Sequence, residues 1–447
     1  MRRSLLGQAA RTGWLLLLML FLLPIHESAV AAEDSGLSLQ QRLDSAFKGE
    51  TIRIPPGRYQ GSFVIRKPLR LEAEGEVVLV ADSAKPPLTI QTNGAVVKGL
   101  QLETAFAETE DSALWMEGSG NEVSELNIRT SGTGVQLRNA LENMLTGIGI
   151  TRISGVNGGG QAQRGNGIDA RESHGNFIRN CFVTNMFDGI YLENSDHNEV
   201  RESAVSMSRY GYHLMFSKGN RLVNNSGDRN VTGAMVMTSE DAVVTGNRWI
   251  KQSESVNSQG LLLYDVKGSR FAGNEVEGNR VGMYIELSDE NELTDNVVRS
   301  NFIGIQIKHG SHNRIQENSF LSNVFQAEAQ ESSENQVSRN YWDAFKGLDT
   351  RGTGFSSIAF QVNPFYYTLT DETPAFQLFF QSPGLALLEQ MMDSGLSEQS
   401  FTDTAPAMGP LHESVPVPLP GWGALVLSLL LAGGSFWIWI KMGVRSK

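Results

Sequence analysis

One histidine and three methionines lie on two short segments that share a local pattern. The first segment, "GYHLM" from residue 211, contains His213 and Met215, and the second, "GAMVM" from residue 233, contains Met235 and Met237. Thioether sulfur is a soft, neutral ligand and imidazole is a borderline one, a combination that suits Cu(I) and disfavours hard ions such as Mg²⁺ or Ca²⁺. Zinc is less expected, because its usual sites use Cys, His and carboxylate ligands. If the four side chains converge, they predict a Cu(I) site.

A repeat of 22 residues determines whether these side chains converge. A glycine that opens a short apolar run recurs in steps of 22 residues, with one step of 27, at Gly167, Gly189, Gly211, Gly233, Gly260, Gly282 and Gly304. A second marker, usually Asn, keeps the same register at Asn121, Asn143, Asn176, Asn198, Asn220, Ala242, Ser269, Asn291, Asn313 and Asn335. Such a unit is too short for a strand and a helix with loops, but it suits two or three short strands with turns.

The repeat therefore predicts an all-β fold, a right-handed parallel β-helix in which each coil buries apolar side chains against the coils above and below. We expect the Asn marker to stack at a turn, where Asn tolerates left-handed backbone and bonds to its own main chain. Two coils are enlarged by Gly-, Ser-, Gln- and Asn-rich stretches at 154–166 and 251–259, which are predicted loops. The second loop either forms a lip over the His/Met coils or is a neutral insertion.

Alternation along each strand predicts which side chains face outward. The first and third positions after each glycine are almost all apolar and are expected in the core, so Tyr212 is not a predicted ligand. The second and fourth positions then point outward, and neighbouring coils lie ~4.8 Å apart. This places His213 beside Met235, and Met215 beside Met237. The flanking outward residues are Asp169, Arg171, Tyr191, Glu193, Leu262, Tyr264, Tyr284, Glu286, Gln306 and Lys308.

Other interpretations of this outer face remain open. Methionine is a common packing residue, so the same pattern fits an apolar patch that a partner or loop covers. An enzyme acting on polysaccharide, either a lyase or a hydrolase, would need carboxylates, or a carboxylate with Arg and Lys, gathered in a groove. Only Asp169, Arg171 and Glu193 offer such groups beside the His/Met coils, and the sequence lacks the compact Asp-Pro-His-Asp cluster of an uronan epimerase. We therefore expect a protein that is not an enzyme; a membrane-anchored carbohydrate-binding or adhesion module is a third possibility.

The ends of the chain predict a location outside the cytoplasm. Residues 1–32 have the basic start, apolar run and small residues of a secretory signal. Leu39, Leu43 and Phe47 have helical spacing after Ser38, so a short helix is expected to cover the open end of the β-helix. Near the other end, Trp422 to Ile440 are 19 uncharged residues, enough to cross a bilayer, and basic residues follow them.

We thus divide the chain into five parts: a signal peptide (1–32), the β-helix with its N-terminal cap (33–340), a C-terminal cap with an apolar docking segment (341–393), a linker (394–420), and a transmembrane helix with a basic cytoplasmic end (421–447). The net charge of −12 without a basic stripe disfavours a nucleic-acid partner. A single cysteine, Cys181, excludes an internal disulfide and is expected to be a buried small residue.

Several segments resemble the NosD family of nitrous oxide reductase maturation proteins over roughly residues 37–392. The specific ones are "RYGYHLMFS", "NYWDAFKGLD" and "FFQSPGLALLE"; the coil motifs "DGIYLENSDHNEV", "GLLLYDV" and "VGMYIELS" are more generic. The resemblance implies a periplasmic β-helix protein that works with an ABC transporter, comprising an ATPase and a permease, to build the copper–sulfide centre of nitrous oxide reductase. It also implies a copper chaperone as donor and the reductase as recipient. The membrane-spanning tail departs from the family pattern and predicts a protein tethered beside its transporter.

Overall fold

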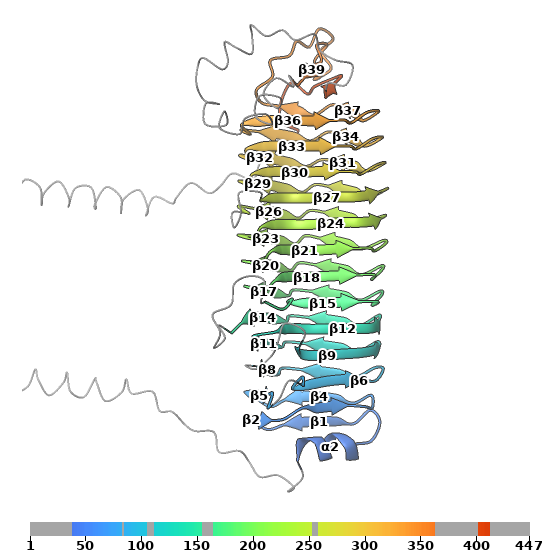
Figure 1. The fold of residues 1–447 in the computed structure, drawn as a ribbon, viewed down its shortest axis with the longest axis vertical. Helices are drawn as coiled ribbons and strands as arrows, with labels where there is room; N and C mark the ends of the chain where they lie inside the picture. The colour runs from blue at the N-terminus through green and yellow to red at the C-terminus, as the bar shows by residue number, and fades with distance from the viewer. Residues whose placement is uncertain are drawn as a thin grey trace, which may run out of the picture.

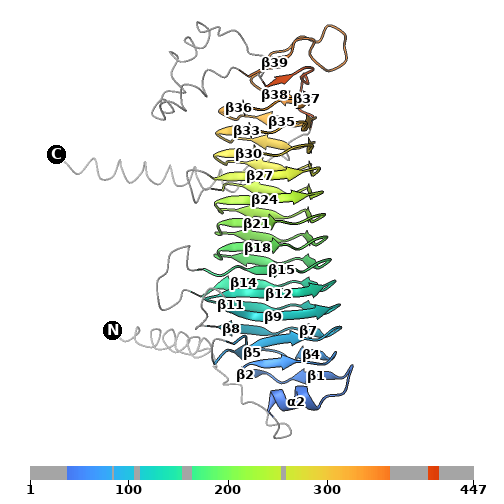
Figure 2. The ribbon, with the colours of Figure 1, turned by 45° about the vertical axis from the view of Figure 1, so that its right-hand side comes forward.

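The computed structural model is a parallel β-helix of about 12 turns, drawn as an upright stack of coils in Figure 1. It describes residues 38–82, 85–104, 111–153, 164–252, 258–362 and 401–411. Three long parallel sheets run along the stack, and each coil except the last gives one strand to each sheet (Figures 1 and 2). The predicted coil of about 22 residues is confirmed.

The first sheet has 13 strands: β1 (Thr51–Ile54), β4 (Arg70–Ala73), β7 (Val96–Lys98), β10 (Glu122–Ser124), β13 (Met144–Thr146), β16 (Phe177–Arg179), β19 (Glu199–Arg201), β22 (Arg221–Val223), β25 (Val243–Thr245), β28 (Arg270–Ala272), β31 (Glu292–Thr294), β34 (Arg314–Gln316) and β37 (Gln336–Ser338). The second also has 13: β2 (Gly57–Gln60), β5 (Val77–Val80), β8 (Gln101–Thr104), β11 (Asn127–Thr130), β14 (Gly149–Arg152), β17 (Phe182–Thr184), β20 (Ala204–Ser206), β23 (Ser226–Asp228), β26 (Arg248–Ile250), β29 (Glu275–Glu277), β32 (Val297–Arg299), β35 (Ser319–Leu321) and β38 (Tyr341–Trp342).

The third sheet has 12 strands: β3 (Phe63–Ile65), β6 (Leu88–Gln91), β9 (Ser112–Ser119), β12 (Thr133–Leu141), β15 (Ile168–Arg171), β18 (Asp188–Glu193), β21 (Tyr210–Met215), β24 (Thr232–Glu240), β27 (Gln259–Lys267), β30 (Val281–Glu286), β33 (Ile303–Lys308) and β36 (Phe325–Gln330). The repeated glycine lies in or just before these strands from β15 to β33. At Gly211 a Cβ atom would lie only 2.5 Å from the carbonyl oxygen of Gly233, so glycine is required there by the close approach of two coils.

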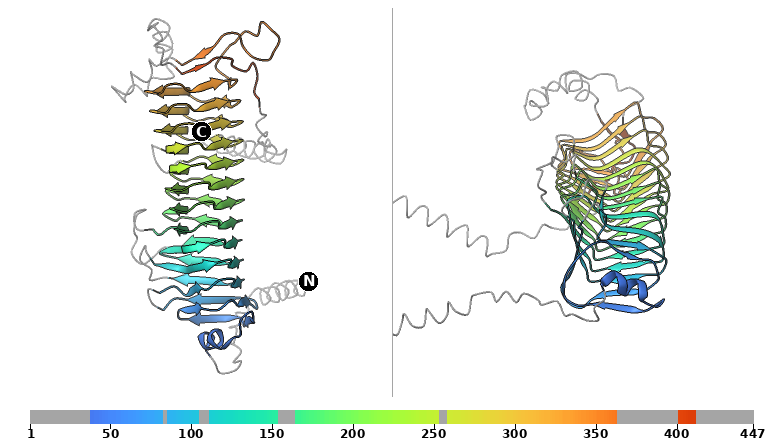
Figure 3. Two further views of the ribbon diagram at one scale, coloured as in Figure 1. Left: turned by 90° about the vertical axis from the view of Figure 1, so that its right-hand side faces the viewer. Right: turned by 60° about the horizontal axis from the view of Figure 1, so that its bottom comes forward.

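The coils of the three sheets enclose the interior of the stack (Figure 3). The buried apolar side chains form one cluster that extends from Leu39 to Phe401. The predicted inward positions are confirmed: Tyr212, Leu214, Ala234 and Val236 are all at most 1% exposed. Cys181 is fully buried, as expected. Apolar burial of this kind, at roughly 25 cal/mol per Å², is the main force that holds the coils together.

The Asn marker forms a buried ladder at a turn, as predicted, but not for the predicted reason. The side-chain Oδ1 of Asn198 accepts hydrogen bonds from the backbone N–H of Asn176 at 2.8 Å and from its Nδ2 at 3.0 Å. The ladder residues do not adopt left-handed backbone; that conformation belongs to the preceding residue, for example His197 (φ 56°) and Glu290 (φ 59°). The expectation of left-handed Asn was therefore wrong, and the Asn amides serve instead to satisfy buried backbone groups.

Two further ladders at the other turns were not predicted. They consist of Asn225, Asn247, Asn274, Asn296, Asn318 and Asn340, and of Asn230, Gln252, Asn279, Asn301 and Asn323.

The N-terminal end is covered by the helix α2 (Leu39–Ser45), at the foot of Figure 1. Ser38 caps it, with Gln41 completing a capping box, and Leu39 and Leu43 are buried, as predicted. The third predicted contact was wrong: the helix ends at Ser45, so Phe47 lies beyond it and is 81% exposed.

The other end is closed by a short antiparallel pair, β39 (Phe360–Gln361) and β40 (Thr402–Asp403). Asp403 is fully buried and accepts hydrogen bonds from the backbone N–H of Asn340 at 2.9 Å and from Nε1 of Trp342 at 3.0 Å. The sequence placed residues 401–411 in a linker, whereas here they pack on the last coil. Asp403 holds these residues on the last coil, because its carboxylate is the final acceptor of the ladder that runs from Asn225 to Asn340.

The predicted signal (1–32), most of the predicted docking segment (363–393) and the predicted transmembrane helix (421–447) lie outside the described residues. Within the described ranges, no helix is both long and apolar enough to span a membrane.

Candidate metal-binding face

The structure brings the four predicted ligands to one place on the outer side of the third sheet. β21 pairs with β24 in parallel, with His213 opposite Met235 and Met215 opposite Met237, as the repeat predicted. Tyr191 on β18 is the partner of His213 on the other side. The three methionines are partly exposed. We call this set of His213, Met215, Met235 and Met237 the His/Met cluster.

His213 is not exposed as expected. Its exposure is only 5%, because two aromatic rings and a carboxylate surround the imidazole. The ring of Tyr191 lies 4.8 Å from that of His213, and the ring of Tyr210 meets it edge-on at 4.9 Å. The histidine is thus held in the surface layer of the sheet, while the thioethers beside it reach solvent.

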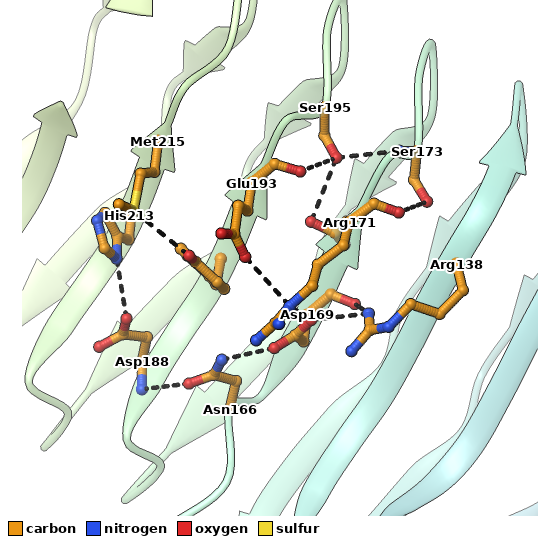
Figure 4. A network of polar contacts seen from close by, with 12 residues as sticks. Arg138, Asn166, Asp169, Arg171, Ser173, Asp188, Glu193, Ser195, His213 and Met215 are labelled. Atoms are coloured by element: carbon orange, nitrogen blue, oxygen red, sulfur yellow. Dashed lines mark hydrogen bonds and ion pairs between the residues drawn. The ribbon is translucent and has the colours of Figure 1, made fainter. Parts of the chain in front are cut away.

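The two ring nitrogens of His213 have different surroundings. Nδ1 is 3.0 Å from Oδ2 of Asp188, at the start of β18. Nε2 is buried and has no hydrogen-bond partner, and Figure 4 shows this nitrogen pointing away from Asp188. A buried polar atom without a partner costs roughly 1–3 kcal/mol, so this nitrogen is a destabilising, unsatisfied group within the cluster.

Asp188 is 1% exposed and is tied to an arginine as well as to His213. Arg209 donates to it twice, from Nε at 2.8 Å and from Nη2 at 2.7 Å. The guanidinium also lies over the rings of Phe187 and Tyr210, at 3.9 and 4.3 Å. Burial alone would raise the pKa of Asp188, but the hydrogen bonds from His213 and Arg209 outweigh it and lower the pKa below the ordinary value.

A second buried carboxylate lies one coil away (Figure 4). Asp169 accepts from Nη1 of Arg138 at 2.8 Å, from Nε of Arg171 at 3.3 Å and from Nδ2 of Asn166 at 2.7 Å. Arg171 also pairs with Glu193 at 3.2 Å. Asn166 links the carboxylate of Asp169 to the backbone of Asp188, because its Oδ1 accepts the backbone N–H of Asp188 at 3.1 Å.

Tyr191 is the register partner of His213 and Tyr264 that of Met237, whereas Tyr284 lies two coils from Met235. The hydroxyl groups of Tyr191 and Tyr284 have different partners. The hydroxyl of Tyr191 donates to Sδ of Met215 at 3.4 Å, and that of Tyr284 donates to Glu286 at 2.8 Å. Burial, followed by the charge of Glu193, raises the pKa of Tyr191, so this phenol stays a neutral donor. Met215 is therefore the thioether that the protein itself already orients.

Sequence reasoning missed Asp188, Arg209 and Arg138. It considered only positions after each repeated glycine, whereas Asp188 immediately precedes Gly189, and Arg209 lies two residues before Gly211. Polar residues just before the glycines, at the same period, were the available signal. Among the described residues, no group of three or more His, Cys, Asp or Glu side chains is arranged to hold a metal ion; the His/Met cluster differs in offering one nitrogen and three sulfur atoms.

Residues 150–352, the coils that carry this face, match the protein family described as "Periplasmic copper-binding protein (NosD)". Over these coils the chain is similar to the NosD family. It is also 30% identical over 284 residues to the "Probable ABC transporter binding protein NosD" of Pseudomonas aeruginosa. That match covers 63% of this chain and 62% of the relative, so the NosD-like chain spans less than two thirds of the relative's length.

Two solved structures with a similar fold are of polysaccharide-modifying enzymes. A mannuronic acid-specific family 6 polysaccharide lyase from human gut microbiota has a TM-score of 0.53 at 12% identity, over 79% of this chain and 95% of its own. The A-module of the Azotobacter vinelandii mannuronan C-5 epimerase AlgE6 has a TM-score of 0.50 at 13% identity, over 68% and 88%. At these identities the likeness establishes the fold alone.

The expectation that the NosD-like chain is not an enzyme is nevertheless corrected. Its architecture is one that polysaccharide-modifying enzymes use. In addition, this face carries more ionisable groups than the sequence predicted. Asp188, Arg209 and Arg138 lie there with Asp169, Arg171 and Glu193.

Proposed function

We propose that this NosD-like chain binds Cu(I) through Nε2 of His213 and the thioethers of Met215, Met235 and Met237, and carries it as cargo. The observation that supports this most directly is the buried Nε2 atom, which has no hydrogen-bond partner and belongs to the residue in register with Met235. A lone pair on a borderline ligand beside soft sulfur atoms is a donor set for Cu(I).

The uneven exposure of the cluster suits a carrier. The three methionines are partly exposed, so a donor protein can reach their side chains, while the histidine is only 5% exposed. Methionine side chains are flexible and can turn toward a bound ion without moving the sheet. All four ligands are neutral, which leaves the ion's charge uncompensated and favours release to a stronger site.

The wider role belongs to the same proposal. The family description names the periplasm and copper, and the relative is named an ABC transporter binding protein. We place this chain outside the cytoplasm, with the ATPase and permease of such a transporter as partners. It would receive copper from a chaperone and pass it to nitrous oxide reductase during assembly of the copper–sulfide centre. Residues 421–447 would anchor the β-helix in the membrane beside the transporter.

Anaerobic competition for Cu(I) against a coloured chelator tests the site. His213→Ala combined with Met235→Ala is expected to abolish high-affinity binding, while X-ray absorption of the loaded wild type should show nitrogen and sulfur neighbours. The matched control changes a histidine and a methionine elsewhere, His174→Ala with Met144→Ala, and should bind as the wild type does. Retained affinity in the first double variant, with its circular dichroism unchanged, would refute the assignment.

A second candidate is a polysaccharide lyase, favoured by the buried Asp188–His213 pair with Tyr191 against the imidazole. A histidine oriented by a carboxylate is a base, and a neutral phenol is a proton donor.

The two candidates differ in their need for sulfur. Replacing all three methionines of the His/Met cluster by leucine preserves volume and apolar character but removes the thioethers. Cu(I) binding is lost in that variant if copper is the cargo. If the lyase candidate is right, the wild type and the variant both release unsaturated uronides from alginate oligomers, seen by ultraviolet absorbance.

A further inference from the structure

Asp188 and Arg209 form a rigid polar unit behind His213, which we call the carboxylate clamp. Both Asp188 oxygens are occupied by Arg209, at 2.8 and 2.7 Å, and Oδ2 also receives His213 Nδ1 at 3.0 Å. The backbone N–H of Asp188 is held by Asn166 at 3.1 Å. The guanidinium of Arg209 is in turn held over the rings of Phe187 and Tyr210. Both side chains of the carboxylate clamp therefore have several contacts that restrict their orientation.

The bond between Asp188 and His213 specifies where the imidazole proton lies. A carboxylate paired twice with an arginine, which does not lose its proton in proteins, is an acceptor only. The hydrogen in the 3.0 Å contact must therefore belong to Nδ1 of His213. In a neutral imidazole the other nitrogen then carries a lone pair and no hydrogen.

We infer that Asp188, held by Arg209, is the positioning residue that keeps His213 in the Nδ1–H tautomer and directs the Nε2 lone pair toward the thioethers. The role of this tautomer in metal binding rests on the proposed Cu(I) function. The tautomer itself does not require a bound metal. The burial of Nε2 without a partner agrees with it, because a proton on that atom would be a buried donor with no acceptor.

The repeat confines this arrangement to one coil. The Cα partner of Asp188 on the next coil is Tyr210, and that of Tyr210 is Thr232, so neither position offers another carboxylate. Asp169 on β15 is also buried, at 3% exposure, and is paired with two arginines, but Tyr191 lies between it and His213 on the outer face. It is a matched control for replacement of a buried, arginine-bound aspartate.

Nitrogen-15 NMR of the metal-free protein, labelled on its seven histidines, measures the tautomer directly. Spectra are recorded above the ordinary histidine pKa of about 6.5, and the signals of His213 are assigned by their loss in His213→Ala. The wild type should show a pyrrole-type Nδ1 and a pyridine-type Nε2. In Asp188→Asn the new amide can donate to Nδ1, so the hydrogen should move to Nε2 and the two signal types should exchange. Asp169→Asn should leave them unchanged.

Cu(I) affinity is the second measurement. Loss of a group that orients a metal-binding histidine typically costs about 10- to 100-fold in affinity, and this range is expected for Asp188→Asn, with no change for Asp169→Asn. A wild-type spectrum with hydrogen on Nε2, or on both nitrogens, would overturn the inference, and it requires no variant to fold. An Asp188→Asn spectrum identical to that of the wild type would also overturn it. The expected tautomer together with no Cu(I) binding would overturn only the proposed function.

Discussion

Replacing Asn247 by alanine tests whether the Asn ladders hold the coils together. This residue is fully buried between β25 and β26. Its Oδ1 accepts the backbone N–H and Nδ2 of Asn225, at 2.8 and 3.1 Å, and its Nδ2 donates to the carbonyl of Leu222 and to Oδ1 of Asn274, both at 2.9 Å. Asn247→Ala removes all four hydrogen bonds at once.

The size of the effect follows from these four hydrogen bonds. The backbone N–H of Asn225 loses its acceptor in a buried turn, which costs about 1–3 kcal/mol, and each of the other three bonds contributes about 0.5–1.5 kcal/mol. Some relaxation and entry of water at the turn will recover part of this. We expect the free energy of unfolding to fall by about 3–5 kcal/mol, the upper end of what single substitutions do.

Guanidinium unfolding, followed by circular dichroism, measures the change. The matched control is Arg248→Ala at the next residue, which removes an exposed salt bridge to Glu275 (2.7 Å) and should cost less than about 1 kcal/mol. If Asn247→Ala destabilised the protein no more than this control, the ladders would not be a major source of cohesion, and apolar stacking alone would have to account for the solenoid.

Three further substitutions or probes have defined outcomes. Burial raises the pKa of Cys181 to about 12, so almost no thiolate exists near neutral pH; Ellman's reagent should detect no thiol in the native protein and one per chain in denaturant. Gly211→Ala should lower the melting temperature and weaken Cu(I) binding, because the new Cβ would lie 2.5 Å from the Gly233 carbonyl and push β21 from β24, at a cost of about 1–3 kcal/mol; Gly409→Ala, with open space around it, should do neither. Asp403→Ala should speed amide hydrogen exchange in β37 and β38 while leaving β21 and β24 protected, because the last ladder amide and Trp342 lose their acceptor.

The fold was predictable from the sequence because the same pattern of residues recurs in successive coils of a solenoid. The glycine and Asn markers share one period, and the alternation in each strand then separates Tyr212, which is buried, from Met235, which is partly exposed. The backbone conformation at the ladder was not predictable, because Asn suits either a left-handed turn or a buried ladder of amides. Residues 401–411 carry no periodic pattern, and only the structure shows that Asp403 reaches back to the end of a ladder.

The candidate site was predictable in register but not in burial. Period two and the 22-residue step are enough to place His213 opposite Met235, as the structure confirms. The depth of His213 depends on Asp188 and Arg209, which come from the preceding coil and the preceding turn. Such contacts join residues 21 and 25 positions apart, and alternation within a strand cannot reveal them.

The order of side chains along the outer face gives a physical reason for metal selectivity. From β12 to β27 one outward column reads Gln136, Asp169, Tyr191, His213, Met235 and Leu262, and the neighbouring column reads Arg138, Arg171, Glu193, Met215, Met237 and Tyr264. Over these coils the charged residues therefore precede the methionines. Each carboxylate on the charged side already has an arginine partner: Asp169 and Glu193 share Arg171, and Asp188 binds Arg209.

A hard cation needs several oxygen ligands and would have to displace these arginines, whereas a soft cation needs only the nitrogen and the thioethers. If the proposed function is correct, the arginines thus disfavour hard cations at this face. One of them, Arg209, also orients His213 for Cu(I) through Asp188.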